Sequence, residues 1–344
     1  MAISSTSGVV VARPPVSRVD WLAPVIAAII LAALPFFLSG YMQDLSMKIM
    51  AYGILALSLE LLVGTTGLVS LGHAAFFGIA AYATVMLSAP LTSTPSIGWL
   101  LPASMACAGL YALVVGALSL RTKGVYFIMV TLAFAQMAYF VFHDTNFGGG
   151  SDGIYLNAKP ELALFGATLI DLNDRMHLYY FTLGSLVATY ALLALILRSR
   201  FGRALSGIRV NEQRMLATGF STYGYKLAAF VIAGTLAGLA GFVVVAKDGV
   251  VNPEFLSWHE SGAILLMIIL GGLGSLRGSV IGAVAFVLLK EFFSSEAILG
   301  RLADHWQLTL GLTMILFVAL LPDGLIGLGR YLTGRGRRRE GKTH

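Results

Sequence analysis

Apolar segments long enough to cross a membrane recur along the chain, with polar segments between them. The first, 21–38, has 18 residues and would extend about 27 Å as a helix at ~1.5 Å per residue. A bilayer core is about 30 Å thick, and a signal-peptide core is shorter, so we expect this segment to be a retained span. The pattern predicts ten membrane-spanning helices, near 21–38, 48–63, 71–87, 99–120, 125–142, 178–197, 226–246, 261–270, 279–293 and 306–321.

The composition supports an all-α, polytopic integral membrane protein. Of the 344 residues, 57% are hydrophobic and 12% are charged, and the mean hydropathy is +0.83. Soluble domains carry about 25% charged residues, roughly twice this share. The single cysteine, Cys107, excludes a disulfide within the chain.

The distribution of positive charge predicts the orientation. If the N-terminus is cytoplasmic, 17 of the 23 lysines and arginines fall in cytoplasmic segments, as the positive-inside rule requires. Both termini are then cytoplasmic. The net charge of +6 lies in patches between spans, which does not indicate nucleic-acid binding. We expect a cytoplasmic segment 1–20, a transmembrane domain 21–328 and a basic cytoplasmic tail 329–344.

The predicted external loops are acidic, and one of them is long. They hold 12 carboxylates against 6 basic side chains. This surface is either a solvated face or a docking face for a soluble partner outside the membrane. Loop 143–177 is long enough to contain a small folded piece, and its segment FGGGSDG, 147–153, is rich in turn residues.

The segment GTTGLVSLGHAAFFGIAAY, 64–82, does not have the pattern of a plain span. Its glycines weaken a helix, and its hydroxyl and imidazole groups need partners that lipid does not offer. We expect a helix that is broken near its start and lines a passage through the protein. The residues predicted to line this passage are Glu60, Gly64, Thr65, Thr66, Gly67, Ser70, His73, Phe76 and Phe77.

The cytoplasmic loop 198–226 is longer than orientation alone requires. Apolar residues recur at near-helical spacing, namely Leu205, Ile208, Met215 and Leu216, and Gly202 and Gly219 bracket them as helix breakers. The pattern predicts a short amphipathic helix. Such a helix either lies on the membrane surface or inserts into a groove on a cytoplasmic partner.

Glycines spaced three or four residues apart occur in two later segments. Gly234, Gly238 and Gly241 lie in the seventh predicted span, and GSLRGSVIG, 274–282, leads into the ninth. Small residues at this spacing let helix backbones approach closely. We expect tight helix packing, with a contact that slides between conformations as the alternative.

The chain lacks a phosphate-binding loop and a metalloprotease motif. GGLGSLRG, 271–278, lacks the Gly-Lys-Ser/Thr ending of a phosphate-binding loop, and no His-Glu-x-x-His occurs. Glu60 and His73 are the ionisable residues nearest the middle of apolar segments. They predict either a proton relay in an ion-coupled carrier or two groups satisfied by local hydrogen bonds. We expect no cofactor and no enzymatic activity of the chain's own.

Several blocks together resemble a known family. LLVGTTGLVSLGHAAFFGIAAY, RTKGVYFIMVTLAFAQMAYFVFHDTNFGGGSDG and SRFGRALSGIRVNEQRMLATGFSTYGYKLAAFVIAGTLAGLAG are similar to permease subunits of branched-chain amino acid ABC importers, LivM type. NPEFLSWHESGAILLMIILGGLGSLRGSVIGA and HWQLTLGLTMILFVALLPDGLIGL resemble the C-terminal part of that family. The resemblance extends over about 48–328, in the family's order.

The resemblance implies a heteromeric importer in the bacterial cytoplasmic (inner) membrane. It implies a second homologous permease, two ATPase subunits that use the ATP, and an external substrate-binding protein. The loop 198–226 would engage the ATPases, because Glu212, Ala217 and Gly219 loosely match the family's coupling loop. The residues predicted for coupling are Gly202, Arg203, Arg209, Glu212, Ala217 and Gly219.

Two points of the resemblance leave the substrate open. The family also contains importers of urea and other amides, so a urea or amide permease is an alternative to an amino acid permease. Glu60 stands where the family normally has asparagine. This difference changes the hydrogen bonding expected beside the broken helix.

Overall fold

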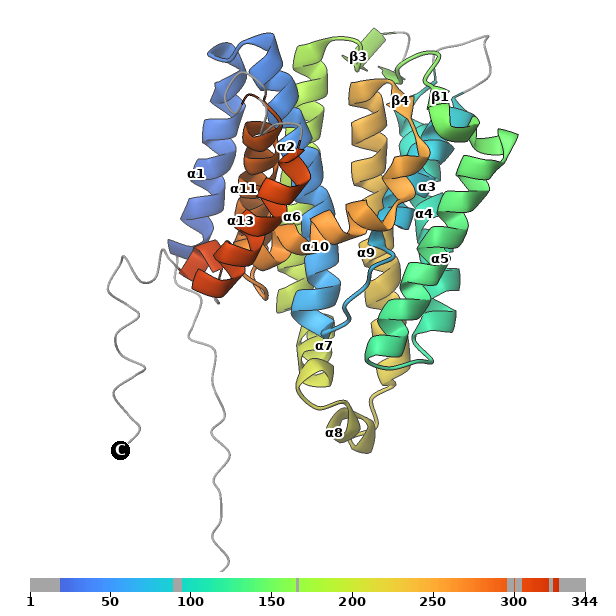
Figure 1. Ribbon diagram of the computed structural model, residues 1–344, viewed down its shortest axis with the longest axis vertical. Helices are drawn as coiled ribbons and strands as arrows, with labels where there is room; N and C mark the ends of the chain where they lie inside the picture. Colours follow the sequence, from blue (N-terminus) through green and yellow to red (C-terminus); the bar gives the residue numbers. More distant parts are fainter. Residues whose placement is uncertain are drawn as a thin grey trace, which may run out of the picture.

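The chain folds into a bundle of apolar helices (Figure 1). The structure is a computed structural model and describes residues 19–88, 95–164, 167–295, 300, 305–321 and 324–327. Most of the predicted segment 1–20 and the whole tail 329–344 lie outside these residues.

The α-helices account for most of the described residues. Their bounds, in chain order, are α1 Val19–Ala33, α2 Gly40–Glu60, α3 His73–Leu87, α4 Ile97–Ser119, α5 Val125–Asp144, α6 Arg175–Arg198, α7 Arg200–Val210, α8 Glu212–Ala217, α9 Thr222–Asp248, α10 Trp258–Gly271, α11 Leu276–Ser294 and α13 Trp306–Leu320. Shorter helical turns are η1 Leu34–Phe36, η2 Leu61–Thr66, η3 Asn146–Gly148, η4 Gly150–Asp152 and η5 Pro253–Leu256.

Each predicted apolar segment overlaps one of these helices, but the helices differ in length. Among the described residues, five are long and apolar enough to cross a membrane: α2 with η2, α4, α5, α6 and α9. The pair α10 and α11 raises this number to six if it counts as one span, and three shorter apolar helices accompany them. The polytopic all-α class is confirmed, whereas ten spans and cytoplasmic termini stay predictions.

Short strands occupy the end of the bundle opposite α8 (Figure 1). Within loop 143–177, β2 (Glu161–Leu164) pairs with β3 (Ala167–Asp171) in an antiparallel hairpin. Strand β1 (Ile154–Tyr155) pairs with β4 (Val250–Val251), which follows α9. The long loop therefore contains local structure, and it is joined to the turn between α9 and α10.

The helices α2 and α9 form the centre of the bundle. Their most apolar windows are 89% and 78% buried inside the protein. A side chain at Gly234 or Gly241 would collide with α4 or α3, and a Cβ at Gly238 would lie 2.8 Å from the Ala108 Cβ. The predicted tight packing is confirmed, because these glycines let three helices approach each other closely.

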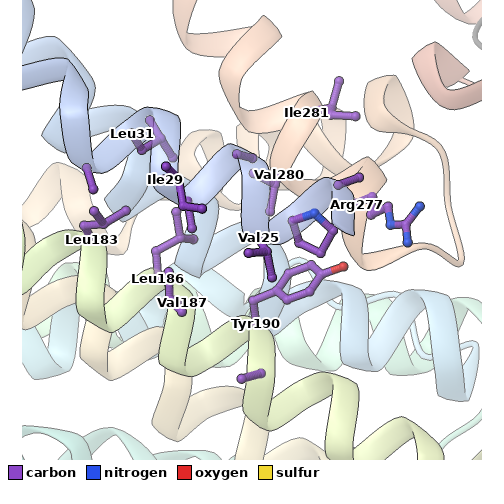
Figure 2. A pocket seen from close by; sticks show the side chains of 16 residues that line it. Val25, Ile29, Leu31, Leu183, Leu186, Val187, Tyr190, Arg277, Val280 and Ile281 are labelled. Atoms are coloured by element: carbon purple, nitrogen blue, oxygen red, sulfur yellow. The ribbon is translucent and has the colours of Figure 1, made fainter. Parts of the chain in front are cut away.

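The peripheral helix α1 packs less closely than the central helices. Between α1, α6 and α11 lies an apolar cavity of about 550 Å³, lined by aliphatic side chains and by Tyr190 and Arg277 (Figure 2). Val25, Ile29 and Val187 line this cavity and are partly exposed on the bundle's outer side. Such a surface suits contact with lipid rather than with water.

The helices α10 and α11 meet at a sharp bend of 117°. The break spans Gly272 to Ser275, and Gly272 and Gly274 have φ angles of 110° and 88°, which disfavour other residues. In Figure 1, α10 crosses the bundle obliquely while its neighbours run lengthwise. Interrupted helices of this kind often place polar backbone groups inside transporters.

The loop 198–226 forms two helices where the sequence predicted one. Ser199 caps α7 and Asn211 caps α8, each by accepting a hydrogen bond from a backbone N–H in the first turn. Because Asn211 has an extended backbone, it ends α7 and starts α8. The prediction that Gly202 breaks the helix is wrong, since Gly202 lies in the first turn of α7 and packs against α6.

Candidate functional site

The predicted break in the third apolar segment lies between α2 and α3. Helix α2 continues from Glu60 into η2, a π-helical segment, and η2 ends at Gly67, which has a φ of 74°. Helix α3 then begins at His73. A π-helical turn is rare and occurs frequently at functional sites. The break leaves 67–72 outside both helices, with Ser70 and Gly72 buried in the bundle.

The side chains at this break are buried by protein. Ser70 and His73 have no exposed surface, Glu60 is 2% exposed, and Phe76 and Phe77 are 1% exposed. Thr65 and Thr66 are also buried, whereas Gly67 is exposed. The structure thus brings these residues together between helices, and their role in lining a passage stays a prediction.

The His73 side chain bonds to Ser58 on α2. Its Nε2 lies 2.7 Å from the Ser58 Oγ, which is also 2.7 Å from the Leu55 carbonyl oxygen. The serine has one proton, so if it donates to Leu55, the His73 Nε2 must carry the proton and donate to Ser58. The buried Nδ1 has no partner among the described residues. It is then an acceptor, which matches a neutral imidazole.

The two phenylalanines of α3 belong to an aromatic layer. The Phe76 ring lies 5.4 Å from the Phe230 ring of α9 and meets it edge to face, and its centroid is 5.6 Å from that of His73. The Phe77 ring lies 5.3 Å from that of Phe255 in η5. Aromatic pairs of this geometry contribute about 0.5–1.5 kcal/mol each. This layer closes the interior beside the break.

Glu60 connects the end of α2 to the break between α10 and α11. The Gly274 backbone N–H donates to the Glu60 Oε1 at 2.7 Å. The carboxylate lies directly against Gly64, where any side chain would collide with it. The break after α2 and the break between α10 and α11 therefore meet at the Glu60 carboxylate. In this chain a glutamate makes the contact, at the position where the family resemblance implies the shorter asparagine.

Glu60 and His73 are not joined by a hydrogen bond. Glu60 bonds to Gly274, whereas His73 bonds to Ser58, which is two positions before Glu60 on α2. Residues two apart on a helix do not face each other. The Glu60 carboxylate and the His73 ring therefore lie beside different faces of α2. This geometry does not favour the predicted proton relay between them.

Arg209 connects α7 to the break. From the last turn of α7, its Nη1 donates to the Gly64 carbonyl oxygen in η2. The π-helical turn leaves that carbonyl available, and the Arg209 side chain also packs against Gly67. A movement of α7 would therefore be transmitted directly to η2. The sequence placed both residues in candidate sites but gave no sign that they touch.

Helix α8 is held to α9 by Glu212. Its Oε1 lies 2.6 Å from the Lys226 Nζ and accepts a hydrogen bond of 3.1 Å from the Thr222 hydroxyl. Burial alone would raise the pKa of Glu212, but the hydrogen bond and charge of Lys226, with the Thr222 hydrogen bond, keep this pKa below its usual 4.5. The carboxylate therefore serves an internal contact.

Gly219 ends α8 in a geometry that favours glycine. Its φ is 87°, the Gly219 N–H bonds to the Leu216 carbonyl, and the Phe220 N–H bonds to the Met215 carbonyl. This pair of bonds is a Schellman motif. Of the other predicted coupling residues, Arg203 donates to the Arg198 carbonyl at the end of α6, and Ala217 is exposed.

The outer surface of the tip formed by α7 and α8 carries apolar side chains that were not among the predicted coupling residues. Val210 is 84% exposed, Leu216 51% and Phe220 39%. They lie on α7, on α8 and just after α8, at the end of the molecule in Figure 1. Exposed apolar groups among charged ones are typical of a contact surface. Their sequence signal was weak, because Leu216 was grouped with the buried Leu205 and Ile208.

Comparison with known proteins identifies the family. The profile of the family "branched-chain amino acid transport system / permease component" matches residues 41–319. This chain belongs to that permease family.

Two kinds of relative define the position of this permease within the family. The high-affinity branched-chain amino acid transport system permease protein LivM of Escherichia coli (strain K12) is 30% identical over 89% of this chain and 75% of the relative. LivH of the same transport system and organism is 23% identical over 80% of this chain and 91% of the relative. The ribose import permease protein RbsC of Escherichia coli matches only 36% of the chain, at 25% identity. No solved structure matches the permease significantly.

The comparisons confirm the LivM-type resemblance and the class of transport protein. The match begins in α2 and ends in α13, so it includes both interrupted helices and also α7 and α8. Members of this family are permease components of transport systems. The permease is thus a multi-pass membrane subunit of an ABC importer.

Proposed function

We propose that this permease forms half of the translocation pathway of an ATP-driven importer of branched-chain or related amino acids in the bacterial inner membrane. The names of LivM and LivH support this substrate class over urea or an amide. A second, homologous permease would form the other half. An external binding protein would deliver the substrate to the end of the bundle that carries the strands.

The observation that carries this proposal is the chain of contacts from the cytoplasmic tip to the broken helix. Two ATPase subunits would bind the exposed apolar surface around Val210, Leu216 and Phe220. ATP-driven movement of α7 would pull on Gly64 through Arg209, and Glu60 would transmit it to the bend at Gly274. The pathway beside the aromatic layer would then open alternately to the external side and to the cytoplasmic side. This mechanism needs no catalytic group in the permease.

The test measures coupling in the assembled importer. We expect Gly219→Ala and Glu212→Ala to reduce amino acid uptake and stimulated ATP hydrolysis while the permease stays in the membrane, because both changes loosen α8. Gly249→Ala is a matched control, since Gly249 has a φ of 69° with open space around it at the opposite end of the molecule. The control should bind the ATPase subunits as the unmodified permease does. Unchanged uptake and hydrolysis in both α8 variants would contradict the proposal.

A further inference from the structure

A polar pocket of about 310 Å³ lies near the end of the bundle that carries the strands. The helices α2, α9, α10 and α11 and the turn after β4 contribute to its walls. Three bases and three carboxylates line it, namely Lys48, Lys247, Lys290, Asp248, Glu254 and Glu260. Neither the family match nor the break between α2 and α3 assigns this pocket a role.

Most of the charges in this pocket are not neutralised in pairs. Lys247 and Asp248 form an ion pair at 2.5 Å. Among the described residues, Lys48, Lys290 and Glu260 have no ion-pair partner within 4.0 Å, although both lysines are close enough to attract the Glu260 carboxylate. Lys290 instead lies over the Trp306 ring, 5.4 Å from its centroid. Unpaired charges of both signs at one cavity favour a ligand that carries both.

The Glu260 carboxylate is available because its usual local partner is occupied. Ser257 caps α10 and Glu260 is three positions later, which is the sequence of a capping box. In such a box the glutamate accepts from the backbone N–H of the serine, but here the Ser257 N–H donates to the Glu254 carbonyl at 3.0 Å. Glu260 accepts only a long bond of 3.4 Å from the Tyr52 hydroxyl, among the contacts of the described residues.

A second acceptor in the pocket lacks a donor. The Asn252 Oδ1 is buried and has no hydrogen-bond partner among the described residues. A buried acceptor without a partner costs about 1–3 kcal/mol, so a ligand that donates there would be stabilised. An ammonium group suits Glu260 and Asn252 together. A carboxylate suits Lys48 and Lys290.

One side of the pocket is apolar and leads toward the break. Val244 and Phe255 line it, and the Phe255 ring packs 5.3 Å from that of Phe77 on α3. Helix α10 is tied to the same region, because the Ala74 N–H donates to the Ser261 Oγ at 3.0 Å. An aliphatic side chain would thus be directed toward the aromatic layer while its charged groups stay with the polar wall.

We propose that this pocket binds the α-ammonium and α-carboxylate groups of a zwitterionic amino acid as it enters the permease. Glu260 and Asn252 receive the ammonium group, Lys48 and Lys290 receive the carboxylate, and the side chain points toward Phe255. The inference rests on the proposed function, since it gives the transported amino acid a site within this subunit.

The experiment measures binding of radiolabelled leucine to the assembled importer in nanodiscs, without the external binding protein. We expect saturable binding that leucine competes for, whereas 3-methylbutylamine and 4-methylpentanoate, which each lack one of the two charged groups, compete at least tenfold more weakly. Glu260→Gln and Lys48→Met should each weaken binding at least tenfold, because each removes a charged partner. Asp44→Asn is the matched control, since Asp44 lies one turn before Lys48 on α2 and faces Arg175 outside the pocket.

Three results would overturn the inference: no saturable leucine binding, equal competition by either single-charge analogue, or unchanged binding in both pocket variants. The competition uses the unmodified importer, so it decides the matter even if a variant fails to assemble. ATP-driven leucine uptake in liposomes with the binding protein separates the two proposals. Uptake without binding at this pocket rejects the inference alone, whereas the absence of uptake rejects the proposed function.

Discussion

The helices α2 and α5 are similarly apolar, yet they differ sharply in what surrounds them. The most apolar window of α2, extended through η2, is 89% buried inside the protein, whereas that of α5 is 22% buried. By mean hydropathy α5 is slightly the more apolar of the two. Hydropathy therefore identifies both as candidate spans but does not say which lies at the centre.

The difference lies in the residues that interrupt the apolar pattern. Helix α2 carries Gly53, Ser58 and Glu60, all buried, and each contacts another helix: Gly53 meets α6, Ser58 meets α3 and Glu60 meets the bend before α11. The exposed face of α5 presents large apolar side chains such as Met129 and Phe140. Polar groups and glycines mark central helices because lipid cannot satisfy the former and close packing requires the latter.

The largest expected effect is on the yield of folded permease when a central glycine, rather than a peripheral one, is substituted. Gly241→Leu in α9 would force a side chain into the Phe77 backbone carbonyl, and backbone cannot move aside as a side chain can. We expect loss of folded permease. Gly184→Leu in α6 is the control, since a side chain there meets nothing within 4 Å. The yield of monodisperse protein after size-exclusion chromatography is the measurement, and equal yields for both variants would refute the distinction.

Removal of the Glu60 carboxylate should have the next largest effect. Glu60→Ala removes the charged acceptor of the part-buried hydrogen bond from the Gly274 N–H, and loss of a hydrogen bond to a charged group costs about 1.5–3 kcal/mol. Glu60→Gln keeps an acceptor oxygen and should cost less. Thermal unfolding in detergent measures both. A similar loss in the two variants would show that the charge, rather than the hydrogen bond to Gly274, stabilises the two breaks.

Exposed valines at the tip and on the membrane-facing surface should behave differently. Val210→Ser, at the end of α7, should weaken binding of the ATPase subunits by roughly fivefold, as loss of a contact worth about 1 kcal/mol would. Val187→Ser, on α6 beside the apolar cavity, should leave that affinity unchanged. Co-purification at increasing ATPase concentration measures the affinity. Equal binding by both variants would remove the tip surface as the docking site.

The smallest effect concerns pH at the tip formed by α7 and α8. Because the pKa of Glu212 is lower in the folded state than its usual 4.5, the contact with Lys226 adds stability that is fully present above about pH 4.5. This stability is lost as the pH falls through the lower folded-state pKa. The contribution is below about 1 kcal/mol, since the pair is partly exposed. The protection of amides 212–217 against hydrogen exchange, corrected for the intrinsic exchange rate at each pH, should fall in acid, and Glu212→Gln should abolish this fall.

The sequence predicts local features well and long-range contacts poorly. The apolar helices follow from hydropathy, and the break before His73 follows from Gly64, Gly67 and the hydroxyl groups between helices. The division of the cytoplasmic loop was missed, because the Asn211 cap depends on backbone geometry that no periodicity reveals. Gly202 does not break the helix as predicted, because a glycine in the first helical turn can allow close packing instead.

The contacts that connect these features depend on residues far apart in the chain. Glu60 and Gly274 are separated by 214 positions, and Arg209 and Gly64 by 145. The polar pocket likewise takes Lys48 from α2 and Lys290 from α11. A single sequence carries no pattern for such pairings, because they result from the packing of whole helices.

The most direct test of the central claim is leucine uptake into liposomes that hold this permease, first alone and then with its sister permease, two ATPase subunits and an external binding protein. The account predicts no uptake by the permease alone, with or without a proton gradient, and concentrative uptake by the complete assembly when ATP is supplied. Proton-driven uptake by the permease alone would contradict it.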